Sequence, residues 1–102
     1  MARLIAMYSP PADKGKFDAY YFGKHIPLAK TLPGLRKYEV NASPVMTVDN
    51  TSPYHLVAVL HFDDLAALRA ATQSDAGKAT AADLANFAQA GVQVVFFEDK
   101  IV

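Results

Sequence analysis

Apolar residues alternate weakly along residues 2–8, and both sides of the alternation are mostly apolar. This pattern is typical of a β-strand that is covered on both faces. The strand must end at Ser9-Pro10-Pro11, because proline has no amide hydrogen to donate to a neighbouring strand. Residues 54–62 (YHLVAVLHF) and 92–97 (VQVVFF) are apolar stretches of the same kind. We expect a strand at each of these three places.

A fourth strand is expected at residues 35–46, where side chains of different character alternate along the chain. Pro44 falls in its second half and indicates a sheet edge, a bulge or a bend. The residues that follow, 47–53 (TVDNTSP), are rich in turn formers. A hairpin between residues 35–46 and 54–62 is therefore the simplest interpretation.

A helical pattern begins after Asp13, whose carboxylate can accept hydrogen bonds from amides of the first turn. Side chains then recur at helical spacing, namely Phe17, Tyr20, Tyr21, Lys24, His25 and Leu28. Gly23 weakens this helix, and Pro27 removes the hydrogen bond that would reach the carbonyl of residue 23. We expect a kink or a break near residues 23–26, with helix resuming to about Thr31.

The region between the last two strands also predicts helix. Asp63 and Asp64 can cap a helix and favour its positive N-terminal end. Residues 74–75 (Ser-Asp) resemble a second cap, and residues 79–90 are again helical in pattern. Gly91 is a natural C-terminal stop.

The predicted order is strand, helix, strand, strand, helix, strand, within a single domain over residues 1–102. This βαββαβ order is the ferredoxin-like arrangement, an α+β fold with an antiparallel sheet and both helices on one face. The strands are apolar on both faces, so the face without helices needs a cover. The simplest cover is a second copy of the same sheet, which predicts a homodimer through the open sheet face.

Composition excludes several classes of partner. Ten basic residues balance ten acidic ones, and they form no basic cluster. The chain therefore lacks the positive charge that binds nucleic acid or an anionic membrane. The apolar start is too short for a signal peptide, and no segment approaches the roughly 20 apolar residues of a membrane span. The chain has no cysteine, as is usual for an intracellular protein. We expect a soluble, cytoplasmic protein.

His25 is the candidate catalytic residue, because a histidine can act as an acid or a base near neutral pH. The alternative is structural, with the imidazole capping carbonyls that the interrupted helix sets free. Tyr21, Tyr8 and Tyr38 are candidate substrate-binding residues, because tyrosines combine an apolar body with a hydroxyl. His61 is a fourth candidate, if it faces a cavity opposite His25.

No metal site or cofactor is expected. His55 and His61 fall on the same side of the expected strand, on the order of 20 Å apart, and cannot hold one metal. The histidines show no ligand spacing of the H-x-x-x-H kind. The sequence also lacks a Gly-rich phosphate loop and a Ser-centred nucleophile elbow.

Several segments resemble the EthD family, which is named for a protein of ethyl tert-butyl ether degradation. The resemblance covers residues 4–97 and is carried by these segments: Tyr8-Ser9-Pro10, FDAYYFGKHIPLAKTLPGLRKYEV from Phe17 to Val40, Tyr54-His55-Leu56, Phe62-Asp63-Asp64-Leu65 and Gly91-Val92. Its core is the set Phe17, Tyr21, His25, Pro27 and Leu28, followed by Pro33-Gly34. Tyr20 and Tyr21 are both candidates for the tyrosine. The resemblance implies a dimeric α+β barrel with a cavity between sheet and helices in each subunit.

The resemblance also implies a role in catabolism of a small, apolar, oxygenated organic molecule, auxiliary to an oxygenase system. The protein would then bind this molecule or act on it through His25, by cofactor-free acid/base or oxygenase-type chemistry. The alternative is a non-catalytic dimer that carries the molecule to a partner. A third possibility makes His25 a haem ligand, as in distant relatives of the fold, although no haem motif is present.

Overall fold

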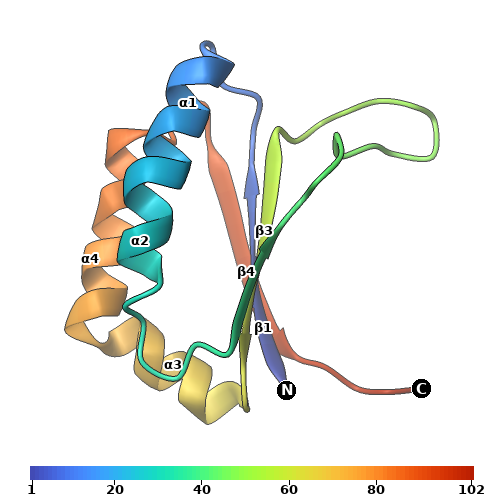
Figure 1. Ribbon diagram of the computed structural model, residues 1–102. Coiled ribbons are helices and arrows are strands. Elements are labelled where there is room, and N and C mark those ends of the chain that lie inside the picture. Colours follow the sequence, from blue (N-terminus) through green and yellow to red (C-terminus); the bar gives the residue numbers. More distant parts are fainter.

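The computed structural model describes all 102 residues as a four-stranded sheet with helices on one side (Figure 1). In chain order, the elements are β1 (Ala2–Tyr8), α1 (Lys14–Tyr20), a π-helical turn (Tyr21–His25), α2 (Ile26–Ala29), β2 (Lys37–Val40), β3 (Leu56–Phe62), α3 (Leu65–Gln73), α4 (Asp75–Asp83), a 3-10 turn (Leu84–Asn86) and β4 (Val92–Glu98). This is the predicted βαββαβ order, so the predicted ferredoxin-like α+β fold is confirmed.

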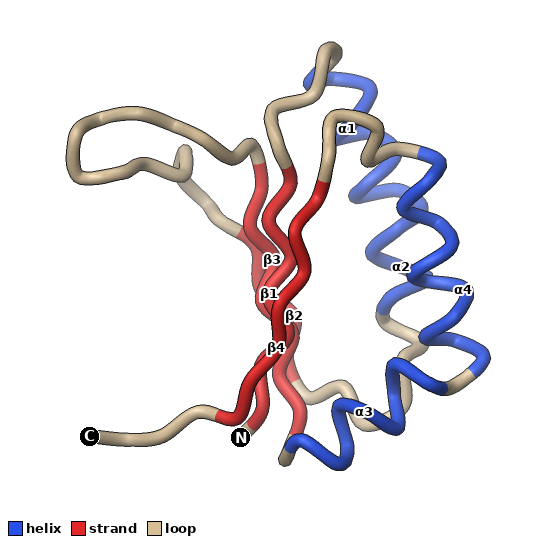
Figure 2. Tube along the Cα trace, turned by 180° about the vertical axis from the view of Figure 1, so that it is seen from behind, coloured by secondary structure: helices blue, strands red, loops and turns tan.

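The sheet is antiparallel throughout, in the order β2-β3-β1-β4. Ala6 at the middle of β1 pairs with Ala58 of β3 on one side and with Val94 of β4 on the other. The residues of one parity, such as Ala6 and Ala58, are buried beneath the helices. Residues of the other parity face away from them. The two views in Figures 1 and 2 both show every helix on the same side of the sheet.

The interruption in the first helical segment is a π-helical turn rather than a break. Tyr21–His25 form the wider turn, and the Ile26 amide donates to the Tyr21 carbonyl, five residues back. Pro27 lies in the first turn of α2, where a missing amide hydrogen costs least. The predicted cap is confirmed, since the Asp13 side chain accepts from the Lys16 amide at 3.0 Å. A single π turn thus keeps the helix continuous past the proline.

The strand expected at residues 35–46 is much shorter, because β2 contains only Lys37–Val40. The strand ends before Asn41, whose backbone amide still donates to the Val57 carbonyl but whose side chain replaces its backbone carbonyl as the acceptor. The side-chain carbonyl oxygen accepts from the Val57 amide at 2.9 Å, and the side-chain NH2 group donates to the Ser43 carbonyl at 2.9 Å. The turn-rich segment that follows extends away from the body of the protein on the side opposite the helices (Figures 1 and 2).

The helical segments after β3 also differ from the prediction. Asp64 caps α3 and Ser74 caps α4, as expected, but Asp63 instead binds Arg36 through two hydrogen bonds. The helix predicted for residues 79–90 begins earlier and ends at Asp83, followed only by a 3-10 turn.

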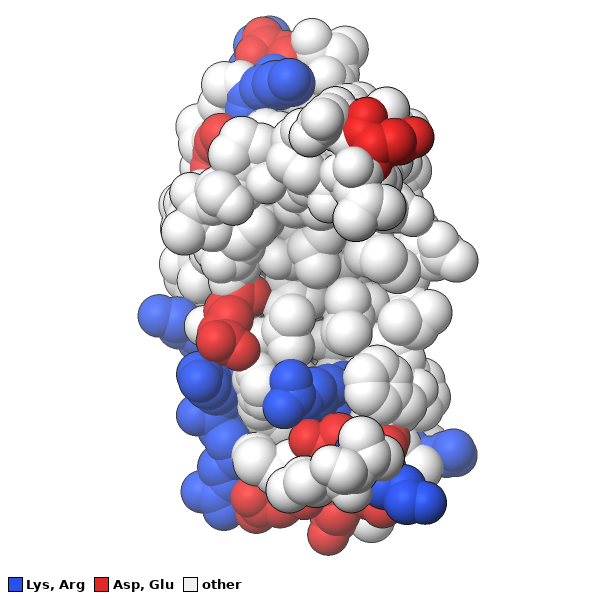
Figure 3. Space-filling view, turned by 90° about the vertical axis from the view of Figure 1, so that its right-hand side faces the viewer, with Lys and Arg blue, Asp and Glu red and all other residues white.

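The sheet face without helices is largely apolar. Register places these side chains on it: Ile5, Met7, Val57, Val59, Val95 and Phe97. Val95 and Phe97 are 38% and 45% exposed. Seen from that side, many charged residues gather toward one end, and the centre of the face is uncharged (Figure 3). Glu39 lies at the edge of the face, in register with Val59. We call this surface the open face. None of the helices has the length and the apolar character needed to cross a bilayer.

Candidate functional site

A cavity of about 270 Å³ lies between the helices and the sheet. Its walls are mostly apolar and come from β1, β3, β4, α2, α4 and the residues around them, including Leu4, Ala6, Ala58, Leu60, Ala81 and Val94. Its polar lining is a small set of side chains, namely His25, Tyr8, Tyr21, Tyr38, Thr72 and Thr80. An apolar cavity with a few convergent polar groups is the usual form of a small-molecule site.

His25 reaches this cavity from the last residue of the π-helical turn. Its side chain is only 4% exposed, and Nδ1 lies 2.9 Å from Oδ2 of Asp83. Nε2 has no hydrogen-bond partner in the protein. In this structure, every side-chain nitrogen or oxygen without solvent contact has a hydrogen-bond partner. Because Nε2 has none, it must be in contact with accessible space. A histidine held through one nitrogen and open at the other is the arrangement of a general base.

Asp83 is the positioning partner of His25. One carboxylate oxygen accepts from the Tyr20 hydroxyl at 2.6 Å and from the Asn86 amide at 2.9 Å, and the other faces His25. Burial opposes ionisation of Asp83, but these three donors outweigh it and lower the pKa of the carboxyl below its usual value. Ionised Asp83 favours a hydrogen on Nδ1 of His25, which leaves the lone pair on Nε2.

Three tyrosine hydroxyls gather at the cavity beside His25. The hydroxyl oxygens of Tyr21 and Tyr38 lie 2.7 Å apart, and the Tyr21 ring centre is 5.3 Å from that of His25. Tyr8 packs edge-on against Tyr21, with ring centres 5.4 Å apart. Burial is the main cause that raises the pKa of each of these tyrosines, so all three remain neutral hydroxyls.

The other two histidines lie outside this group. His61 is on the open face of the sheet, where Nε2 is 2.6 Å from Oε1 of Glu39. His55 does not share that face, because it precedes β3 and turns toward α1. Its ring packs edge-on against Phe17, and Nε2 is 2.7 Å from Oδ1 of Asp18. Each histidine is thus paired with a different carboxylate.

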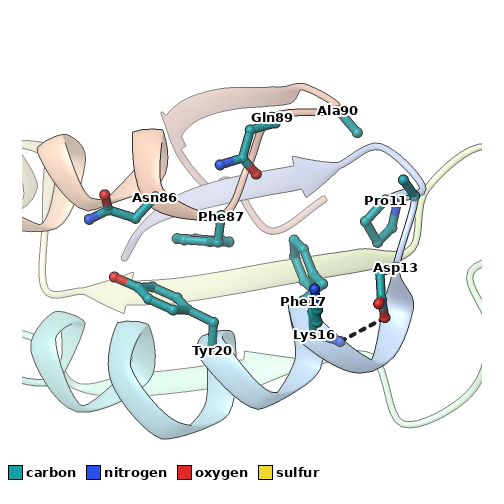
Figure 4. Close-up of a pocket in the computed structure, with 10 residues that line it drawn as sticks. Pro11, Asp13, Lys16, Phe17, Tyr20, Asn86, Phe87, Gln89 and Ala90 are labelled. Atoms are coloured by element: carbon teal, nitrogen blue, oxygen red, sulfur yellow. Dashed lines mark hydrogen bonds between the residues drawn. The ribbon is translucent and has the colours of Figure 1, made fainter.

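A second, open depression of about 570 Å³ lies outside the cavity, between the start of α1 and the segment before β4 (Figure 4). Tyr20 and Phe87 form part of its wall. The Phe87 ring also lies 4.6 Å from the His25 ring, centre to centre, and is 6% exposed. Phe87 therefore separates the open depression from the histidine.

The structure brings His25, Tyr21, Tyr8 and Tyr38 together, as four of the five candidate residues, and leaves His61 on the other side of the sheet. Sequence reasoning missed Asp83, which lies 58 residues after His25. Within the predicted helix of residues 79–90, Asp83 resembles any polar residue on a solvated face. Only the fold shows that Asp83 is the hydrogen-bond partner of His25, because α4 packs beside the first helix.

These features define a class of protein, a ferredoxin-like α+β domain with a histidine–carboxylate pair at an apolar cavity. The family model of the EthD domain matches residues 9–91. The chain belongs to the EthD family.

Two relatives match nearly the whole chain. An uncharacterized 11.0 kDa protein of the thcB-thcC intergenic region of Rhodococcus erythropolis is 34% identical over 102 residues, covering 100% of this chain and 98% of the relative. The crystal structure of an EthD family protein from Bacillus halodurans C-125 has a TM-score of 0.88 and 35% identity, covering 98% of this chain and 99% of its own.

More distant solved structures share the fold. SnoaB, a cofactor-independent oxygenase from Streptomyces nogalater, has a TM-score of 0.68 and 15% identity, covering 99% of this chain and 94% of its own. A dimeric ferredoxin-like protein of unknown function from Thermobifida fusca has a TM-score of 0.66 and 20% identity, covering 94% and 88%.

Proposed function

We propose that this protein binds a small, largely apolar, oxygenated organic molecule in its cavity and moves a proton on that molecule through His25. The observation that carries the proposal is the His25–Asp83 pair, with Nε2 unpartnered at an apolar cavity of about 270 Å³. Membership of the EthD family supports a role in catabolism, auxiliary to degradation by an oxygenase system.

The residues of the site suggest how the proton moves. Asp83 holds the hydrogen on Nδ1 and stabilises the positive charge that His25 acquires when Nε2 takes a proton. The mostly apolar walls lower the local dielectric, which strengthens both interactions. Tyr21 and Tyr38 orient the oxygen of the molecule, with Tyr8 beside them. Acid/base chemistry of this kind calls for no cofactor from the protein.

A second candidate function is a non-catalytic carrier, which delivers the molecule to a partner oxygenase. The apolar cavity favours it as much as it favours catalysis, because binding alone requires only the walls. A panel of ethers, lactones and phenols, tested for both binding and turnover with the wild-type protein, separates the two functions. Binding with no turnover of any compound would favour the carrier over the catalyst.

Filling the cavity should impair both functions. Ala58 is 1% exposed and lines the cavity from the middle of β3, so Ala58→Leu would place three more carbon atoms in it. We expect ligand affinity to fall at least tenfold, as measured by calorimetry, while thermal stability is kept because the new side chain occupies empty space. Val57→Leu, one residue earlier on the open face, is the matched control. Unchanged affinity in Ala58→Leu would place the ligand elsewhere.

We also propose that two copies associate through the open face. Its support is the apolar, uncharged middle of that face, together with the dimeric state of a protein of the same fold from Thermobifida fusca. Burial of this surface against a second copy would remove a large apolar area from water, at roughly 25 cal/mol per Å².

Ile5→Lys tests the dimer, because Ile5 lies on the central strand between Val59 and Val95. A lysine at this position stays solvated in the monomer but would be buried in the dimer, so we expect the dissociation constant to rise more than 100-fold in sedimentation experiments. Ala82→Lys, an exposed position on α4, should leave association unchanged. A wild-type protein that sediments as a monomer at micromolar concentration would contradict the proposal.

A further inference from the structure

The polar groups of the cavity divide into a donor side and an acceptor side. The Thr72 and Thr80 hydroxyls already donate to the carbonyls of Arg69 and Ala76, at 2.9 and 2.7 Å. They offer no free hydrogen to a ligand. The remaining polar lining is the three tyrosines and His25. A ligand that hydrogen-bonds within the cavity must do so with these four side chains.

The tyrosines supply a free donor. Tyr21 and Tyr38 lie within hydrogen-bond distance of each other, and either can be the donor. Two hydroxyls carry two hydrogens, and their mutual bond uses one. The Tyr8 hydroxyl adds a third hydrogen and at most one more hydrogen bond within this group of tyrosines. At least one hydroxyl hydrogen therefore remains to be donated, and no carboxylate lines the cavity to receive it.

His25 supplies the acceptor. Its Nδ1 is engaged by Asp83 and its Nε2 is unpartnered in the same cavity. The complementary ligand has an oxygen that accepts from a tyrosine and a hydrogen acidic enough for an imidazole to remove. An ether provides the oxygen but lacks the acidic hydrogen. A carbonyl compound with a hydrogen on the neighbouring carbon provides both.

We propose that the substrates are enolisable carbonyl compounds, with the Tyr21–Tyr38 pair holding the carbonyl oxygen while His25 removes a proton from the adjacent carbon. This inference rests on the proposed function and specifies its substrate class. Nε2 of His25 forms a bond to the hydrogen as the C–H bond breaks. The C–H electron pair becomes the C=C bond of the enolate, and the carbonyl π pair moves onto oxygen. The imidazolium then returns the proton to carbon, so no oxidant or reductant is consumed.

The tyrosines would act where charge develops, because the enolate oxygen accepts a stronger hydrogen bond than the carbonyl does. Burial raises the pKa of Tyr21 and Tyr38, which keeps them protonated and able to donate. Removal of one such donor in other enzymes costs about 10²–10³-fold in rate. Tyr38 is the better position to test, because it lies on the edge strand β2 and Phe would keep its packing.

The first experiment follows exchange of the α-hydrogens of 1-indanone in D2O by NMR. We expect the wild type to exceed the buffer rate, Tyr38→Phe to lose at least tenfold of that excess, and Tyr54→Phe, outside the cavity, to retain it. Thermal melts establish that each variant is folded, and Tyr21→Phe replaces Tyr38→Phe if the latter is not. A folded Tyr38→Phe, or a folded Tyr21→Phe in its place, with unchanged exchange would overturn the role of the tyrosine pair.

The second experiment compares 4-nitrophenol, whose phenolate mimics an enolate, with 4-nitroanisole, an ether of similar shape that cannot ionise. Below the pKa of the free phenol, we expect binding to increase the phenolate absorption band. If both compounds bind equally and the phenol stays protonated, the substrate class is overturned while ligand binding by the cavity stands. If neither compound binds and no exchange occurs, the proposed function fails with it.

Discussion

Substituting glutamine for His25 is expected to lower turnover about 10³-fold while ligand affinity changes by less than about threefold. The glutamine amide can still donate to Asp83, which preserves the buried hydrogen bond now made by Nδ1. It cannot accept a proton from a bound molecule. The expected change is therefore in kcat, because the lost interaction exists only while the proton is moving.

The control is His55→Gln, which removes another histidine that pairs with a carboxylate, at 2.7 Å from Asp18, but does not line the cavity. Its turnover should equal that of the wild type. Stopped-flow or steady-state assays with the compound that shows the highest turnover would measure both variants. Equal activity of His25→Gln and the wild type would remove His25 from the chemistry.

Asp83→Asn should reproduce most of this loss by another route. The asparagine oxygen can still accept from Tyr20 and Asn86, so its NH2 group would face Nδ1 of His25. An NH2 group cannot accept the Nδ1 hydrogen, so the imidazole would carry its hydrogen on Nε2 instead. Nε2 would then have no lone pair with which to accept a proton. Nitrogen NMR of labelled histidine detects this change of tautomer directly. A purely structural Asp83 would alter stability without altering the tautomer.

The fold was predictable because its signals are local. The strand at Ala2–Tyr8 has the predicted bounds, and the caps at Asp13 and Ser74 were evident from residue type alone. The second strand was overestimated since alternation continues past Val40, while the Asn41 side chain ends the ladder there. Side-chain capture of a backbone amide depends on tertiary geometry, which periodicity does not contain.

The site was only half predictable for a similar reason. His25 and Tyr21 stand out because an interrupted helix brings unusual residues together within a few positions. Asp83 and Phe87 contact His25 from the far end of the chain. Their roles arise where the segment from α4 to β4 packs against the first helix. His61 was a candidate on the condition that it faced a cavity opposite His25, but the helices and the cavity lie on the other face of the sheet.

Gly77→Ala is expected to destabilise the protein strongly for so small a substitution. A Cβ at residue 77 would lie 2.2 Å from the carbonyl oxygen of Ala71 and 2.5 Å from that of Thr72. Both are backbone atoms of α3, so relief requires the two helices to separate rather than a side chain to rotate. We expect a loss of about 3 kcal/mol in unfolding free energy and a melting temperature roughly 15 °C lower.

The same substitution should also damage the site, because α4 carries Gly77 near its start and Asp83 at its end. Oδ2 of Asp83 lies 2.9 Å from Nδ1 of His25. Moving α4 away from α3 would displace the Asp83 carboxylate and disturb this contact. Gly23→Ala is the matched control, since no atom lies within 4 Å of the added Cβ, and it should change stability by no more than about 1 kcal/mol. Calorimetry at equal protein concentration compares the two variants. A melting temperature of Gly77→Ala within a few degrees of the wild type would mean that α3 and α4 can separate at little cost, and that Asp83 is held by its own hydrogen bonds rather than by the packing of its helix.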